Sequence, residues 1–127
     1  MRLKNLLIVV EDIEKSKAFY RDLFGMHIVT DFGGNVILTE GLVLQERGQW
    51  ETAIGRDVRK GGNDAELYFE EYDFDGFLAK LRDGGHQVEI ITQPGQGDGG
   101  KKVVRLYDPD GHVIEVAEAC ESRRRFL

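Results

Sequence analysis

The sequence predicts an α+β fold built from two similar βαβββ modules. Three observations support this prediction. An apolar run, a helix-like stretch and three short strand-like runs follow one another, and this order occurs twice. At an offset of 61 residues Asp12 matches Asp73, and the dipeptide 21–22 matches the dipeptide 82–83. A repeated unit with an apolar sheet face buries that face by combining with a second unit, so we expect one domain with two halves.

The first module opens with a strand and a helix. Residues Leu3–Val10 are rich in leucine, isoleucine and valine and predict a buried strand. Asp12 is placed to cap a helix over Ile13–Phe24, whose apolar positions form a single stripe. Gly25 is placed to end that helix, because the residue just past a helix often needs a positive φ.

Three short strands complete the first module. We expect them at Met26–Phe32, Val36–Thr39 and Leu42–Glu46, separated by turns at Gly33–Asn35 and Glu40–Gly41. Turns this closely spaced are typical of antiparallel strands that follow one another.

The middle of the chain, Arg47–Asn63, is polar and contains four glycines, so it predicts a linker with room for one helical turn. We therefore interpret the whole chain, 1–127, as one domain. Its parts are half 1 at about 1–46, a linker at 47–63, half 2 at about 64–118 and a tail at 119–127.

The second module repeats the pattern of the first. Its helix is expected to start at a cap on Asp73, to run to about Asp83 and to end at Gly84–Gly85. The remaining predicted elements are strands at Glu66–Glu71, His86–Thr92, Lys101–Tyr107 and His112–Glu118, a loop at Gln93–Gly100, and a tight turn at Asp108–Gly111.

Composition excludes several classes of function. The formal net charge of −6 argues against nucleic acid and membrane surfaces as partners, since both attract a basic surplus. The basic run 123–125 is expected to be a solvated tail, pairing with Glu118 and Glu121. The single cysteine, Cys120, rules out an internal disulfide. No signal peptide or membrane-length apolar run is visible, so a cytoplasmic location is expected.

Three motifs resemble the vicinal-oxygen-chelate superfamily, which contains glyoxalases, bleomycin-resistance proteins and extradiol dioxygenases. They are the stretch from Val9 through Phe19-Tyr20 to Gly25, the strand Glu66–Glu70, and the hairpin from Leu106 through Asp108-Pro109-Asp110-Gly111 to Val116. The resemblance spans about Leu3 to Ala117. It implies a cupped mixed sheet around a pocket shared by the two modules, with helices on the outer face, and assembly as a homodimer.

The resemblance also implies four pocket positions, two in each half. In this chain they are Asn5, Gln45, Glu66 and Glu115. Members that use a metal often have histidine at the positions of Asn5 and Glu66, and this chain departs from that pattern. The remaining set, with Gln45, Glu66 and Glu115 as metal ligands, offers only oxygen donors, which suit hard cations such as Mn²⁺ better than Ni²⁺ or Zn²⁺. The cofactor is therefore expected to be none, with a divalent metal (Mn, Ni or Zn) as the weaker alternative.

Each pocket position also has a structural explanation. Glu115 either faces a pocket or pairs with Arg105 on the neighbouring strand, and Glu66 either faces the pocket or simply begins a surface strand. Gln45 either faces the pocket or belongs to a solvated strand end, and Asn5 either faces the pocket or makes a hydrogen bond within the fold. The three histidines, at 27, 86 and 112, are all expected to start strands and match no ligand position.

The middle segment supplies further candidate ligand-binding residues. Arg47 and Trp50, with Arg56 and Arg59, would give a lid with an aromatic wall and anion contacts. A solvated connector is the simpler explanation for each arginine, whereas Trp50 is expected to pack onto something.

Two functions of different classes compete. The first is binding of a small organic molecule in the cavity between the modules, without a histidine-type metal site. The second is a glyoxalase-I-like, metal-dependent lyase of the lactoylglutathione type, with Glu66 and Glu115 as catalytic residues. A dioxygenase is disfavoured, because it normally needs two histidines and one carboxylate around iron.

Overall fold

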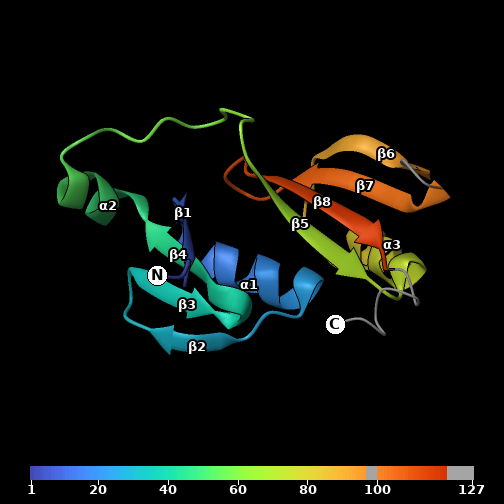
Figure 1. The fold of residues 1–127 in the computed structure, drawn as a ribbon, viewed down its shortest axis with the longest axis horizontal. Coiled ribbons are helices and arrows are strands. Elements are labelled where there is room, and N and C mark those ends of the chain that lie inside the picture. Colours follow the sequence, from blue (N-terminus) through green and yellow to red (C-terminus); the bar gives the residue numbers. More distant parts are fainter. Residues whose placement is uncertain (97–99, 120–127) are drawn as a thin grey trace. The chain divides into compact units, whose positions relative to one another are not determined.

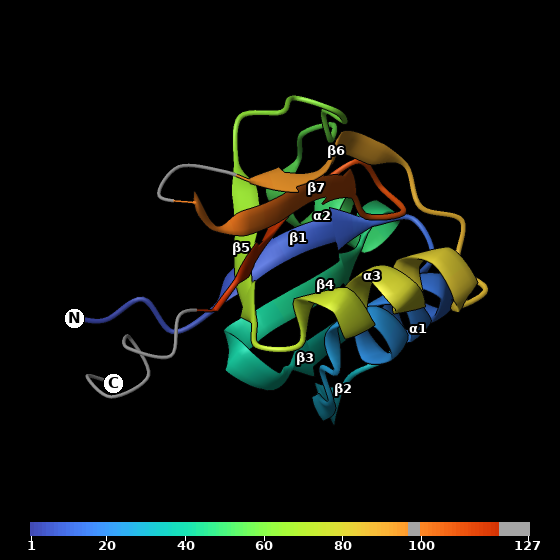
Figure 2. The same ribbon diagram turned by 90° about the vertical axis from the view of Figure 1, so that its right-hand side faces the viewer.

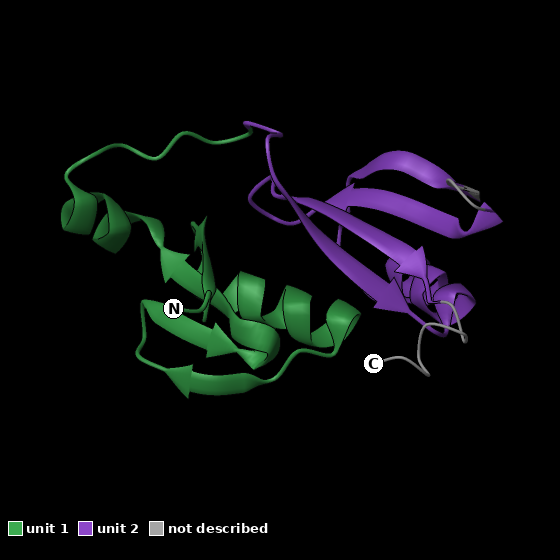
Figure 3. Ribbon diagram, in the orientation of Figure 1, with its two compact units in different colours: residues 1–61 green, residues 62–127 purple. Residues whose placement is uncertain are grey.

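The computed structural model describes residues 1–96 and 100–119, and the chain forms two compact units, Met1–Gly61 and Gly62–Leu127 (Figures 1 and 3). Each unit contains one four-stranded mixed sheet. The α+β fold class and its two βαβββ modules are therefore confirmed.

Unit 1 carries its strands in the spatial order β1-β4-β3-β2. β1 runs parallel to β4, and the remaining neighbours are antiparallel. The elements of unit 1 are β1 (Leu6–Val10), α1 (Ile13–Phe24), β2 (Ile28–Asp31), β3 (Asn35–Leu38), a 3₁₀ turn (Thr39–Gly41), β4 (Leu42–Glu46) and α2 (Arg47–Ile54).

Helix α1 begins and ends where the sequence predicts. The Asp12 carboxylate accepts a hydrogen bond from the Lys15 amide at 3.1 Å, which satisfies one of the free donors of the first turn. Gly25 closes the helix at φ 65°, and its amide donates to the Arg21 carbonyl at 3.1 Å. Only glycine adopts this left-handed conformation without steric cost, so Gly25 fixes the point where the chain turns back to the sheet.

One face of the unit 1 sheet forms an apolar core with α1. Alternating residues of the strands point to this face and are nearly inaccessible to solvent. α1 contributes Phe19, Tyr20 and Leu23, and the rings of Phe19 and Tyr20 meet edge to face with centroids 5.1 Å apart. The strand residues of this core are Ile8, Val10, Val36, Leu38, Leu42 and Leu44.

Unit 2 repeats this topology with the order β5-β8-β7-β6. β5 and β8 lie side by side in both views and run parallel, as β1 and β4 do (Figures 1 and 2). Its elements are β5 (Glu66–Glu71), α3 (Phe74–Asp83), β6 (Ile90–Gln96), β7 (Lys102–Tyr107) and β8 (Val113–Glu118).

Helix α3 is capped like α1 at its start. The Asp73 carboxylate accepts from the Gly76 amide at 3.0 Å, and the Gly84 amide donates to the Lys80 carbonyl at 2.8 Å at the other end. The buried apolar residues of unit 2 come from α3 and from alternating positions of the two central strands. They are Phe74, Phe77, Val104, Leu106, Ile114 and Val116, while Ala117, which pairs with Val103, is buried on the other face of the sheet.

The tight turn between β7 and β8 is also confirmed. Gly111 takes φ 85°, and its amide donates to the Asp108 carbonyl at 3.1 Å. The buried Asp108 carboxylate accepts from the amides of Asp110 and His112, both at 2.9 Å. Asp108 therefore holds the hairpin by its side chain as well as its backbone.

Some predicted strand boundaries were wrong. β1 begins at Leu6 instead of Leu3, because its neighbour β4 begins at Leu42, after a 3₁₀ turn in which Glu40 takes φ 68°. β2 is shorter than predicted. It covers Ile28–Asp31 only, with an irregular register opposite β3.

The sequence placed the strand before β7 too early. β6 covers Ile90–Gln96, so it includes Pro94 and part of the predicted loop. Proline lacks an amide donor, and it is tolerated because β6 lies at the edge of its sheet, beside β7. The register shift between Thr92 and Gly95 falls around this residue. Residues 97–99 of the predicted loop lie outside the described residues.

The predicted linker starts with a two-turn helix, where the sequence left room for one turn. The Glu46 carboxylate caps α2 by accepting from the amides of Gly48 at 2.9 Å and Gln49 at 2.7 Å, and Gly55 ends it at φ 66°. Glutamate is not among the usual capping residues, which is why the sequence did not predict this start.

No helix in the described ranges is long and apolar enough to span a membrane. Cys120 and the basic run 123–125 of the predicted tail lie outside the described residues.

Candidate functional site

Asn5 does not lie on the first strand, which corrects the prediction. It is exposed and precedes β1, level with Gly41 at the start of β4. A β-carbon on Gly41 would lie 2.7 Å from the Lys4 carbonyl oxygen and 3.5 Å from Asn5 Oδ1, so the backbones approach closely here. Glycine at 41 permits this approach.

Gln45 lies at the other end of the same strand pair. It is 8% exposed, and its side-chain oxygen accepts from Asn35 Nδ2 at 2.8 Å, while its Nε2 donates to the Glu46 carbonyl at 3.2 Å. Since Gln45 pairs with Val9, it stands four residues along the strand from Asn5, about 13 Å at 3.3 Å per residue. The fold does not bring Asn5 and Gln45 together.

The strand register identifies the true equivalent of Glu115 in unit 1. The repeat offset of 61 maps Leu7 onto Tyr68. The β4 partner of Leu7 is Val43, and the β8 partner of Tyr68 is Glu115. Val43, a buried apolar residue, therefore takes the place of Glu115 in unit 1.

The two predicted glutamates of unit 2 differ in environment. Glu66 is exposed at the first position of β5, opposite Val113. The Glu115 side chain keeps only 13% of its surface accessible, and its Oε1 lies 2.6 Å from Nη2 of Arg105. The ion pair with Arg105, one of the two interpretations that the sequence left open, is present.

Glu115 belongs to a line of polar residues that crosses the whole unit 2 sheet. Successive register pairs join one residue from each strand in the order β5, β8, β7, β6. We call this line the polar row: Tyr68, Glu115, Arg105 and Thr92. It alternates along the strands with the buried apolar residues, so it lies on the opposite face of the sheet. Period-two alternation in β7 and β8 was the sequence signal for this row, but only the register aligns its members.

His112 lies at the turn between β7 and β8 and is not a member of the polar row. His112 Nδ1 lies 2.7 Å from Oδ2 of Asp108, whose side chain is fully buried at the β7–β8 turn. Burial alone lowers the pKa of His112, but the hydrogen bond and charge of Asp108, with the charge of Asp110, outweigh it and raise the pKa above 6.5. The backbone amide of His27 donates to Thr39 Oγ1 at 3.2 Å, which joins the residue before β2 to the residue after β3.

Ion pairs hold Arg47 within unit 1. Its Nη1 lies 2.6 Å from Glu11 Oε1, and its Nε lies 3.4 Å from Glu51 Oε2. Lys60 contacts the same Glu11 oxygen. Hydrogen bonds from Lys60 and Arg47 hold the pKa of Glu11 below its usual value. These contacts fasten the segment after α2 to the end of β1, which is a structural role for Arg47.

The other candidate residues of the middle segment are Trp50, Arg56 and Arg59. Trp50 is half-buried on α2, and Arg56 and Arg59 are exposed. Arg56 Nη1 donates to the neighbouring Gly55 carbonyl at 2.8 Å, so this side chain contacts the backbone of its own loop.

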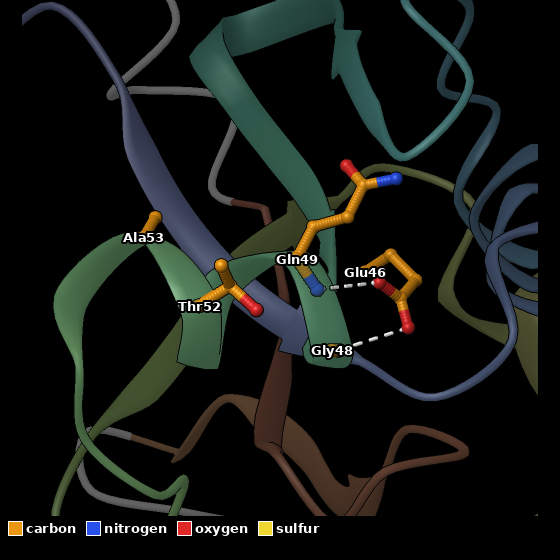
Figure 4. Close-up of a pocket in the computed structure, with 5 residues that line it drawn as sticks. All are labelled: Glu46, Gly48, Gln49, Thr52 and Ala53. Carbon is orange, nitrogen blue, oxygen red and sulfur yellow. Dashed lines mark hydrogen bonds between the residues drawn. The ribbon is translucent and has the colours of Figure 1, made fainter.

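A shallow surface pocket of about 540 Å³ lies along α2 (Figure 4). It is lined by Glu46, Gly48, Gln49, Thr52 and Ala53. Its one charged side chain, Glu46, points its carboxylate back to the helix amides that it caps. The pocket therefore has no charged group left to orient a ligand, and the sequence did not predict it.

A model of the glyoxalase-like domain matches residues 3–121. The chain belongs to the glyoxalase-like domain family. With it, membership of the vicinal-oxygen-chelate superfamily is confirmed.

Solved structures agree with this assignment. A protein of unknown function from Agrobacterium tumefaciens str. C58 is 36% identical, with a TM-score of 0.81, covering 94% of this chain and 95% of that one. A glyoxalase-related enzyme from Fulvimarina pelagi is 19% identical, with a TM-score of 0.79 and coverages of 93% and 88%. A lactoylglutathione lyase from Agrobacterium tumefaciens is 23% identical, with a TM-score of 0.71 and coverages of 93% for both chains. At these identities the last two show a shared fold.

The residues of this glyoxalase-like domain do not fit a histidine-type metal centre. Asn5 and Glu66 replace the expected imidazoles, and Val43 occupies the register position that mirrors Glu115. Glu115 itself is paired with a guanidinium. A Zn²⁺ or Ni²⁺ site favours imidazole nitrogen, and a valine offers no donor atom.

Proposed function

We propose that this glyoxalase-like domain binds a small organic molecule and does so without a histidine-type metal site. The observation that supports the proposal best is the polar row on the unit 2 sheet. A sheet face that serves only as core is apolar, as the opposite face is, because burying polar groups is costly unless they are paired. A charged pair at the middle of a face is typical of a binding surface with a few placed polar groups.

The donor set supports the metal-free part of the proposal. A metal at the family position would compete with Arg105 for the Glu115 carboxylate, which already lies at ion-pair distance from a cation that is always charged. Unit 1 offers the apolar Val43 at the matching register position. The similarity to a lactoylglutathione lyase makes metal-dependent lyase chemistry through Glu66 and Glu115 the outcome that a test must distinguish.

The test combines metal content with thermal stability. The protein is purified without chelator, its bound metal is measured, and its unfolding midpoint is recorded with Mn²⁺, Ni²⁺ and Zn²⁺. Wild type is compared with Glu115→Gln and with the control Glu89→Gln, which alters an exposed glutamate of the same unit. We expect substoichiometric metal and equal shifts in all three proteins.

A second arm tests binding itself. A library of small organic molecules is screened against the wild-type protein by ligand-observed NMR, and hits are repeated with Glu115→Gln. The proposal requires at least one specific ligand whose affinity falls in Glu115→Gln and is unchanged in Glu89→Gln. Stoichiometric Ni²⁺ or Zn²⁺ that is lost only in Glu115→Gln would overturn it in favour of the lyase.

A further inference from the structure

The Arg105–Glu115 pair is asymmetric in its exposure to solvent. Glu115 keeps 13% of its side-chain surface accessible, whereas Arg105 keeps 43%. Both sit on central strands of the sheet, so neither belongs to a solvated edge. The Glu115 carboxylate is thus largely shielded from solvent, whereas the Arg105 guanidinium is accessible to a ligand.

The chemistry of the guanidinium leaves donors to spare. Arginine carries five N–H donors in a planar fork, and one carboxylate accepts from at most two of them in the usual side-by-side geometry. Within the described part of the chain, Glu115 is the one ion-pair partner of Arg105. A guanidinium held by one carboxylate keeps a preformed edge for a second planar anion, at low entropic cost.

The neighbours of Arg105 narrow the class of ligand. Thr92, its register partner on β6, carries a hydroxyl that donates or accepts. Tyr68, the partner of Glu115 on β5, is 48% exposed and brings an aromatic surface. A carboxylate joined to a planar or apolar group matches this row better than a bare inorganic anion.

We propose that Arg105 is the anion-binding residue of this domain and takes the carboxylate of a small organic acid, with Glu115 as the residue that positions it. Arg105 then supplies the fixed positive charge that a metal would bring beside residue 115. This inference rests on the proposed function and adds the substrate class to it.

Matched acid and amide probes test the inference. Benzoate and phenylacetate are compared with benzamide and phenylacetamide by ligand-observed NMR and by chemical-shift titration of ¹⁵N-labelled protein. The variants are Arg105→Gln and Arg105→Lys, and the control is Arg82→Gln, an α3 arginine whose partner is its neighbour Asp83. We expect the wild type and the control to bind the acids at least tenfold more tightly than the amides.

Each variant has its own expected result. Arg105→Gln should bind acids and amides equally, and Arg105→Lys should keep a reduced preference, because an ammonium retains the charge without the planar fork. Circular dichroism checks folding, and Arg105→Lys keeps the test valid if Arg105→Gln does not fold. For Glu115→Gln, the Arg105 Nε–H resonance should broaden while the backbone spectrum is retained, which a general structural role would not produce.

The outcomes separate the two proposals. Equal binding of acids and amides by the wild type overturns this inference and leaves small-molecule binding in place. An acid preference that survives in Arg105→Gln overturns it as well. If neither these probes nor any molecule of the wider library binds, both proposals fail.

Discussion

The Asp108–His112 pair gives a stability that depends on pH in a defined direction. The Asp108 side chain is fully buried. Its Oδ1 accepts from the amides of Asp110 and His112, and its Oδ2 lies 2.7 Å from His112 Nδ1. Asp108→Asn keeps the shape and retains an oxygen for the two amides, which the same carboxylate oxygen, Oδ1, accepts in wild type. What it removes is the charged acceptor opposite the imidazole.

The magnitude follows from that one contact. A hydrogen bond between charged partners contributes about 1.5–3 kcal/mol, so Asp108→Asn should cost about 2 kcal/mol where His112 is protonated. Where His112 is neutral, its Nδ1 can accept from the new amide, and the cost should fall below about 1 kcal/mol. Because the pKa of His112 is raised in the folded state, its contribution is fully present below the unfolded value of about 6.5. It is lost as pH rises through the folded pKa.

Urea unfolding of wild type, Asp108→Asn and His112→Gln at pH 5.5 and 8.5 measures this difference. The double variant completes a cycle at each pH and isolates the pair from other titrating groups. An NMR titration of His112 should place its pKa above 6.5 in wild type and lower in Asp108→Asn. A coupling energy that is equal at the two pH values, or larger at pH 8.5, would refute the reasoning.

Two further changes test buried polar groups of unit 1. Ser16 is fully buried on α1, and within the described residues its hydroxyl has no hydrogen-bond partner. Ser16→Ala should therefore raise the free energy of unfolding, measured by urea titration, by about 0.5–1 kcal/mol. A lower free energy of unfolding would show that the hydroxyl has a hydrogen-bond partner. Asn35→Ala should lower the free energy of unfolding by about 1–3 kcal/mol, because it leaves the buried Gln45 oxygen without its donor. The double variant Asn35→Val/Gln45→Leu removes both partners and should be close to neutral. An equal loss of stability in the double variant and in Asn35→Ala would contradict this account.

The two sheets differ on the face away from their apolar cores. In unit 1 that face carries Val43 and the Asn35–Gln45 amide pair, whereas in unit 2 it carries the charged Arg105–Glu115 pair. The two units therefore share one fold, but the charged pair lies on the sheet of unit 2. This asymmetry is the reason to place the anion-binding residue in unit 2.

The sequence alone determined the modules and most of their boundaries. Caps at Asp12 and Asp73, and the glycine at 25, depend on local hydrogen bonds and on positive φ, which neighbouring residues encode. The start and full length of helix α2 were not predicted, because its cap is Glu46 and glutamate rarely caps a helix. Strand ends were misplaced where the partner strand sets them, as at β1, whose start depends on a turn at Thr39–Gly41.

The candidate site divides in the same way. The family resemblance implied Glu115 as a pocket position, and the predicted neighbouring strands suggested Arg105 as its partner. Only the register decided that they face each other, that Val43 and not Gln45 mirrors Glu115, and that Asn5 lies outside the strand. Register is a long-range property, since a shift of one residue sends every side chain to the other face without changing local propensity. Glu115 and Arg105 could therefore be identified from the sequence, whereas their alignment into one row depends on the folded sheet.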